Sequence, residues 1–119
     1  MKRDMELIRK ILFQLEETQN LDYQYEFEVD GYDYTTVFYH LLLLHDAGFI
    51  DAIVTKPRSP YARRIEPVRL TWQGAEFLEA MRSDTVWADV NNRMAAVGGF
   101  VTEVALALAI KLISRQAGL

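Results

Sequence analysis

Five residues between positions 56 and 64 could do chemistry on a nucleic acid: Lys56, Arg58, Tyr61, Arg63 and Arg64. The stretch KPRSPYARR contains two prolines and no core pattern, which predicts an exposed loop. Its four cations can contact DNA phosphates, and such contacts carry no base information. A solubilising hairpin tip explains the same residues equally well, so both interpretations stand.

The two histidines are weaker candidates for chemistry. His40 and His45 are five residues apart, which on a helix turns their side chains about 140° apart, so they cannot share a metal ion. His40 is instead expected as a hydrogen-bonded histidine at the margin of the core. The sequence contains no cysteine, no nucleophile constellation and no glycine-rich phosphate loop. We therefore expect no metal, no cofactor and no enzymatic activity.

An acidic tract precedes the basic loop, because residues 16–33 contain carboxylates and no base. Within this tract, YQYEFEVD alternates aromatic or apolar residues with polar ones, which predicts a half-buried strand with an acidic outer face. Such a face protects an edge strand from aggregation. The alternative is a surface that imitates DNA phosphates and binds a basic site on a host protein.

The composition is that of one ordinary globular domain, with 119 residues, 50% of them hydrophobic, and a net charge of −4. The lack of cysteine suits a reducing cytosol, and the mixed charges of MKRDMELIRK argue against a signal peptide, so we expect a cytoplasmic protein. The most apolar segment, residues 97–113, contains Glu103 and Lys111. We interpret it as a buried helix and not as a membrane span.

The periodicity of apolar residues predicts an α+β fold. Helices are expected over residues 4–17, 35–47, 72–82, 84–97 and 101–116, and strands over 23–30, 49–55 and 64–70. Asp4 and Thr71 suit helix N-caps, and Gly48 suits a helix C-terminus. Pro67 indicates that its strand is bulged or lies at an edge.

This order of elements is that of a winged helix-turn-helix domain, with a helix that ends in AGFI, a hairpin with a basic loop, and a helix that opens with LTWQG. Such domains usually carry two helices between the first helix and the hairpin, whereas residues 20–34 show no apolar helical pattern for one of them. We expect a winged-helix-like domain over residues 1–83 and a helical self-association segment over 84–119, together in one compact unit.

Three stretches carry a resemblance: MKRDMELIRKIL, YHLLLLHDAGFIDA and RLTWQGAEFLEAMRSDTVW. They resemble a phage- and prophage-associated bacterial family of unknown function, the domain-of-unknown-function family numbered 2513. Its members typically begin with MKRDMxLIR and share Y-H-L, A-G-[LF]-I and LTWxG motifs. The resemblance implies a small winged-helix-like protein and brings no activity or catalytic residues with it.

The helix expected over residues 35–47 is apolar on nearly every side. One face carries Val37, Leu41 and Leu44, with His40 at its edge, and the other carries Thr35, Tyr39, Leu42, Leu43 and Asp46. Base readout needs Arg, Lys, Asn or Gln, and the second face has none. We expect that face to contact another subunit or the C-terminal helices and not DNA.

The C-terminal helix is apolar over a wide surface, so we expect a homodimer held by residues 100–116. The residues predicted at the interface share one side of the helix: Val101, Ala105, Leu108 and Leu112. Trp72 and Trp87 lie near apolar helical faces and are expected in core or subunit packing.

These patterns predict a small, non-enzymatic protein with a DNA-binding, transcription-regulator-like scaffold, and the family resemblance implies that it is a phage or prophage accessory protein. As a dimer, it would place two basic loops on the DNA backbone. The alternative is a protein-interaction module of the same fold that binds and modulates a host factor through its acidic or apolar faces.

Overall fold

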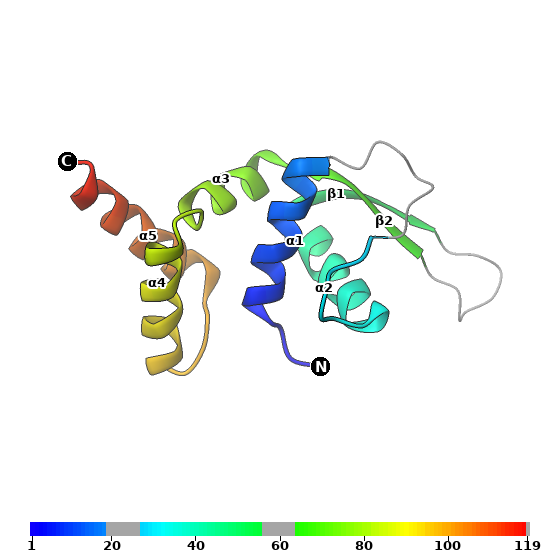
Figure 1. Ribbon diagram of the computed structural model, residues 1–119, viewed down its shortest axis with the longest axis horizontal. Coiled ribbons are helices and arrows are strands. Elements are labelled where there is room, and N and C mark those ends of the chain that lie inside the picture. The colour runs from blue at the N-terminus through cyan, green and yellow to red at the C-terminus, as the bar shows by residue number, and fades with distance from the viewer. Residues whose placement is uncertain (19–26, 56–63, 119) are drawn as a thin grey trace. The chain divides into compact units, whose positions relative to one another are not determined.

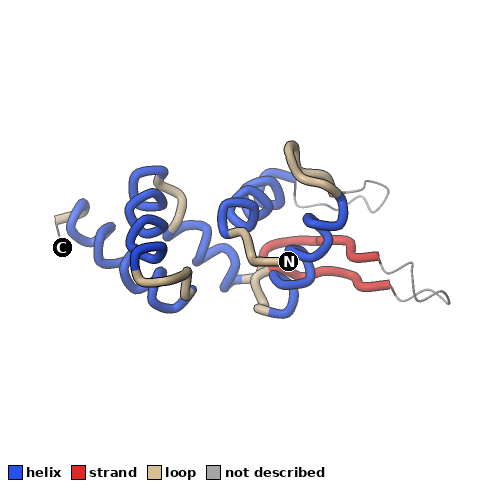
Figure 2. Tube along the Cα trace, turned by 90° about the horizontal axis from the view of Figure 1, so that it is seen from below, coloured by secondary structure: helices blue, strands red, loops and turns tan. Residues whose placement is uncertain are grey.

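The computed structural model describes residues 1–18, 27–55 and 64–118. Its elements follow in this order (Figures 1 and 2): α1 (Met5–Thr18), α2 (Tyr34–Asp46), β1 (Ile50–Thr55), β2 (Arg64–Leu70), α3 (Trp72–Ala80), α4 (Asp84–Ala96) and α5 (Thr102–Gln116). In the described residues these are five helices and a two-stranded antiparallel sheet, which confirms the α+β class. The chain forms two compact units, Met1–Ala75 and Glu76–Leu119, whose boundary lies inside α3 and before the one expected after residue 83.

Helix α1 begins at the aspartate that was predicted to cap it. The Asp4 carboxylate accepts hydrogen bonds from the backbone N–H groups of Glu6 at 3.0 Å and Leu7 at 3.2 Å, which satisfies two donors at the helix start. The predicted apolar stripe is buried: Ile8, Ile11, Leu12 and Leu15. Through this stripe α1 packs in the first unit, where it contacts α2 and β2 (Figure 1).

Helix α2 is capped at both ends by residues with suitable local chemistry. The Asp33 carboxylate accepts the Thr36 backbone N–H at 2.8 Å. Hydrogen bonds from the Thr36 side chain and backbone lower the pKa of the Asp33 carboxyl. At the other end Gly48 has a φ of 76°, the left-handed conformation that commonly ends a helix. The predicted inner face is buried: Val37, His40, Leu41 and Leu44.

Strands β1 and β2 pair antiparallel from Ile50 and Leu70 to Thr55 and Arg64. The register shifts where Asp51 and Ala52 pair with Arg69 and Pro67, so Val68 is the extra residue of a bulge. This confirms the bulge predicted at Pro67, which cannot donate a ladder hydrogen bond. Helix α2 contacts both strands of this hairpin.

The predicted acidic strand is wrong for the residues that the structure describes. Residues 27–29 have no regular structure and Asp30 and Gly31 form a turn, while residues 23–26 lie outside the described part. A strand needs a partner, and the only sheet among described residues pairs β1 with β2. The segment is instead held by α1, because the Gln14 side-chain amide donates to the Glu28 carbonyl at 2.7 Å.

In the second unit, α4 and α5 pack against each other across a glycine turn. Ser83 caps α4 by accepting the Val86 N–H, and the buried residues of α4 are Val86, Trp87, Val90 and Met94. Gly98 and Gly99, with φ of 100° and 154°, separate α4 from α5. Val97, the last residue expected in this helix, lies just past its end and is 77% exposed.

Candidate functional site

The hairpin end is the place where the predicted DNA-binding residues meet the described structure. Thr55 of β1 pairs with Arg64 of β2, so the segment that connects the two strands leaves and re-enters the sheet at the same end of the hairpin. Arg64 is exposed there. The other predicted residues of this site lie outside the described residues: Lys56, Arg58, Tyr61 and Arg63.

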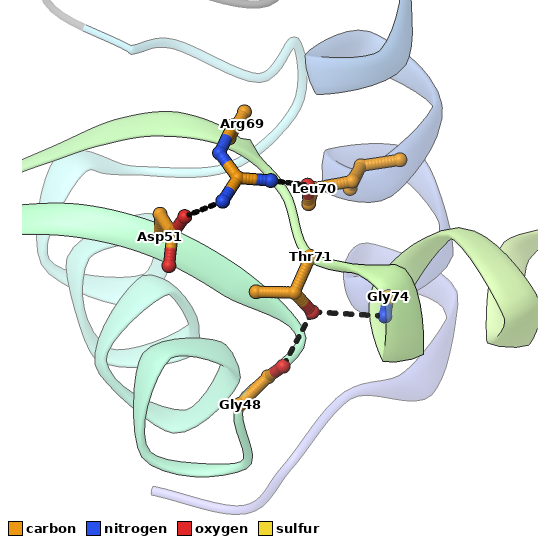
Figure 3. Close-up of polar contacts among 6 residues, drawn as sticks. All are labelled: Gly48, Asp51, Arg69, Leu70, Thr71 and Gly74. Carbon is orange, nitrogen blue, oxygen red and sulfur yellow. Dashed lines mark hydrogen bonds and ion pairs between the residues drawn. The ribbon is translucent and has the colours of Figure 1, made fainter.

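A second arginine of the hairpin, Arg69, is already engaged. Its guanidinium forms an ion pair with the Asp51 carboxylate at 2.6 Å and donates to the Leu70 carbonyl at 3.2 Å (Figure 3). Both side chains are about half exposed, so the pair contributes only about 0–1 kcal/mol to stability. Asp51 therefore offsets the positive charge of the Arg69 guanidinium.

The outward face of α2 offers no base-reading chemistry. Thr35 and Asp46 are exposed, and Tyr39, Leu42 and Leu43 are half-buried. Helix α2 contains no Arg, Lys, Asn or Gln over its whole length. Helix α2 therefore packs in the first unit through one face, and its other face lacks the side chains that read base edges.

His40 has a structural role in the first unit. It is fully buried, whereas it was predicted at the margin of the core. Its Nε2 accepts the Asp4 backbone N–H at 2.8 Å, and its Nδ1 lies 2.8 Å from the Thr36 carbonyl oxygen. These contacts require a neutral ring with the proton on Nδ1. Through them, His40 joins the start of α1 to α2. Sequence reasoning missed this link, because Asp4 lies 36 residues away.

Among the described residues, no group of three or more His, Asp or Glu side chains is arranged to hold a metal ion. His45 is half-buried, and its Nδ1 has no hydrogen-bond partner among the described residues. The two histidines therefore have different environments. Both ring nitrogens of His40 have hydrogen-bond partners, whereas Nδ1 of His45 has none among the described residues.

A junction of four residues, Gly48, Phe49, Thr71 and Gly74, connects the α2–β1 turn to the start of α3. Figure 3 shows three of them, Gly48, Thr71 and Gly74. The Thr71 hydroxyl donates to the Gly48 carbonyl and accepts the Gly74 N–H at 3.1 Å, as predicted for an N-cap. The Thr71 N–H donates to the Phe49 carbonyl at 3.0 Å. A Cβ on Gly74 would lie 1.9 Å from that same Phe49 oxygen, so only glycine fits.

A hollow of about 370 Å³ lies beside the start of α2. Its lining combines carboxylates with aromatic rings: Phe27, Glu28, Asp30, Tyr32 and Tyr34. One ring of this set already meets a cation, since Lys10 Nζ lies 5.5 Å from the centroid of Tyr32. Carboxylates next to ring faces are a suitable environment for an ammonium or guanidinium group.

The model of a family described as "Hypothetical protein (DUF2513)" matches residues 2–100. The chain belongs to this family. It is also 42% identical over 91 residues to an uncharacterized protein of Haemophilus influenzae, covering 73% of this chain and 73% of that protein. No solved structure matches the chain significantly.

The motifs of this DUF2513 chain that carried the resemblance are largely accounted for by its fold. Asp4 and His40 form one link, and Gly48, Thr71 and Gly74 form the junction. Each motif supplies a cap, a buried hydrogen bond or a close backbone approach. None of these contacts implies a reaction.

The tryptophans of this family member differ in exposure. Trp87 is 5% exposed and its ring centroid lies 5.7 Å from that of Phe100, which confirms its core placement. Trp72 is 76% exposed, so it does not pack in the core, and packing against another subunit stays a prediction. It lies in the first turn of α3, two residues before Gly74, and a two-residue step along a helix turns a side chain to the opposite face.

The four predicted interface residues differ in exposure. Val101 is 56% exposed and precedes α5, Leu108 and Leu112 are half-buried, and Ala105 has no exposed surface. Helix α5 begins at Thr102, beyond the residues that the family model matches. Among the described residues, no helix is long and apolar enough to cross a membrane.

Proposed function

We propose that this protein is a small, non-enzymatic DNA-binding accessory protein of phage or prophage, whose first unit is a winged-helix-like scaffold. The order α1, α2, hairpin and α3 supports the winged-helix assignment. The binding proposal rests on the pairing of Thr55 with Arg64. Because these two residues are paired, the basic segment between them leaves and re-enters the sheet at the same end of the hairpin. Lys56, Arg58 and Arg63 lie between these two residues in the chain, so three further cations accompany Arg64 in the sequence.

Binding of this kind is independent of DNA sequence. Helix α2 lacks base-reading side chains, and Arg69 is neutralised by Asp51. The four remaining loop cations would neutralise phosphates and release counterions. The slope of log affinity against log salt is then at most about 4 for each loop, because each phosphate contributes about 0.9. A dimer would present two loops.

The test is a fluorescence anisotropy titration of a labelled duplex at several salt concentrations. Replacing Arg63 and Arg64 by alanine should weaken binding equally on two unrelated duplexes and lower the salt slope by about 2. The matched control replaces Arg82 and Arg93, two ion-paired arginines of the second unit, and should leave the slope unchanged. Normal binding by the Arg63 and Arg64 variant, or no binding by the wild type at low salt, would contradict the proposal.

A second candidate function is a protein-interaction module for a host factor, and the hollow beside α2 favours it. Glu28 and Asp30 offer carboxylates next to the rings of Tyr32 and Tyr34, which suits a lysine or arginine of a basic partner. Exchange of Glu28 and Asp30 for Gln and Asn should abolish binding of an arginine-rich peptide, while Glu76→Gln should not. Binding that survives the double exchange excludes the hollow as the site.

A further inference from the structure

The exposed outward face of helix α5 differs in composition from the buried side of the same helix. Five residues form this face: Glu103, Val104, Ala107, Ile110 and Lys111, all exposed. Val104 and Ile110 are each 54% exposed. Ala105 and Ala109, on the opposite side of the helix, have no exposed surface. The small side chains of α5 therefore pack inside the second unit, and larger aliphatic ones face outward.

The outward face is symmetric about Ala107. Val104 and Ile110 lie three residues before and after it, and Glu103 and Lys111 lie four residues before and after it. Apolar residues thus occupy matched positions, and an acid is matched by a base. On a helical wheel with 100° per residue, all five fall within about 120°, centred on Ala107. Such a face is complementary to itself when a second copy runs in the opposite direction.

We propose that α5 pairs with α5 of a second copy of this chain, antiparallel, with the two-fold axis beside Ala107. This arrangement brings Glu103 to the level of Lys111 of the second copy, and Val104 to the level of Ile110. Each two-fold interface therefore has two acid–base pairs, flanked by the aliphatic side chains of Val104 and Ile110. The alanine at the crossing point is small enough for helix axes to approach within 8–10 Å, the usual packing range.

The charges decide the direction of the pair. In a parallel pair, Glu103 would face Glu103 and Lys111 would face Lys111, and both contacts are repulsive. In the antiparallel pair the same four groups attract each other, because opposite charges meet at both ends. A single helix pair buries less than the ~800 Å² per partner of a standard interface, so the dimer is reversible and depends on concentration.

This pairing rests on α5 alone and does not depend on DNA binding. It also differs from the interface that the sequence pattern indicated, since Ala105 lies on the inner side of the helix. Failure of the DNA titrations would leave it untouched, and failure of the pairing would leave one loop per chain still able to contact phosphates.

The first experiment is a charge exchange, with the association constant measured by analytical ultracentrifugation up to about 100 µM. Glu103→Lys and Lys111→Glu should each weaken association roughly tenfold, since each change converts two attractive pairs into repulsive ones. The double exchange should restore association to within about twofold of the wild type. A wild type that stays monomeric, single variants that associate normally, or a double variant no better than the singles would each overturn the proposal.

The second experiment uses the absence of cysteine from the chain. In an Ala107→Cys variant, the two introduced thiols lie next to the two-fold axis, and mild oxidation should join two chains by a disulfide. The control is Ala88→Cys, an exposed alanine of α4, which should cross-link much more slowly. Both positions are exposed, so circular dichroism should show intact helices. Equal cross-linking of the two variants would show random collision and refute the placement of the axis.

Discussion

Replacing Gly74 by alanine tests the junction between the α2–β1 turn and α3. The new Cβ would lie 1.9 Å from the Phe49 carbonyl oxygen and 2.9 Å from the carbonyl carbon. Real Cβ atoms essentially never approach another heavy atom within 3.0 Å, and the obstacle here is backbone, not a flexible side chain. The first turn of α3 must therefore move away from Phe49.

The size of the loss follows from the contacts that this movement breaks. Three hydrogen bonds join Thr71 to Gly48, Phe49 and Gly74, and each is worth about 1 kcal/mol net. Residual overpacking adds about 1 kcal/mol or more. Alanine recovers about 1 kcal/mol through its higher helix propensity. The expected net loss is roughly 2–4 kcal/mol, and a loss of 3 kcal/mol lowers Tm by about 10 °C for a chain of this size.

The assay is urea unfolding followed by circular dichroism, with the free energy of unfolding compared between variants. Ala75→Gly is the matched control, because Ala75 is exposed in the same helix and its exchange costs only helix propensity, about 1 kcal/mol. If Gly74→Ala is as stable as the wild type or more stable, the close approach of α3 to Phe49 does not exist and the reasoning is refuted.

Three further predictions concern buried or capping groups. His40→Ala should cost about 3 kcal/mol in urea unfolding, because it opens a cavity and leaves the Asp4 N–H unsatisfied, whereas His45→Ala should cost clearly less. Because folding lowers the pKa of Asp33 from its ordinary value of 3.8, the charged carboxylate stabilises the fold above about that pH and this contribution is lost as pH falls. The difference in unfolding free energy between wild type and Asp33→Asn should therefore shrink from pH 5 to pH 3, and a constant difference would contradict this. Acrylamide should quench a red-shifted fluorescence component that Trp72→Phe removes, leaving the buried Trp87; equal quenching of both tryptophans would contradict their exposures.

Local signals in the sequence predicted most of the described elements. Asp4, Gly48 and Thr71 each act on backbone groups a few residues away, so their caps could be predicted without knowing the rest of the fold. The same holds for the bulge beside Pro67, which follows from a missing N–H. Helix ends and the hairpin therefore needed no long-range information.

The errors arose where a pattern depends on a distant partner. The alternation in YQYEFEVD predicted a strand, but no described strand pairs with residues 27–30. Trp72 was expected in core or subunit packing and Val97 inside a helix, although Trp72 lies opposite Gly74 on α3 and Val97 lies past the end of α4. Residue type alone does not fix helical phase at the end of a helix.

The candidate site was only partly predictable. The basic character of residues 56–64 was evident from composition, and their conformation as a loop stays a prediction, whereas the ion pair of Arg69 with Asp51 needed the register. The sequence pattern placed the self-association interface on the side of α5 that carries Ala105. In the structure Ala105 and Ala109 have no exposed surface, and α4 and α5 contact each other.

The sequence separation between hydrogen-bonded residues also predicts an order of folding. In the first unit, the His40 bond spans 36 residues and the Thr71–Gly48 bond spans 23, so both require closure of long loops. In the second unit, α4 and α5 are consecutive helices joined by a short glycine turn. Contacts between sequence neighbours form faster than distant ones. In pulsed hydrogen exchange during refolding, the amides of α4 and α5 should therefore become protected before those of α1 and the hairpin.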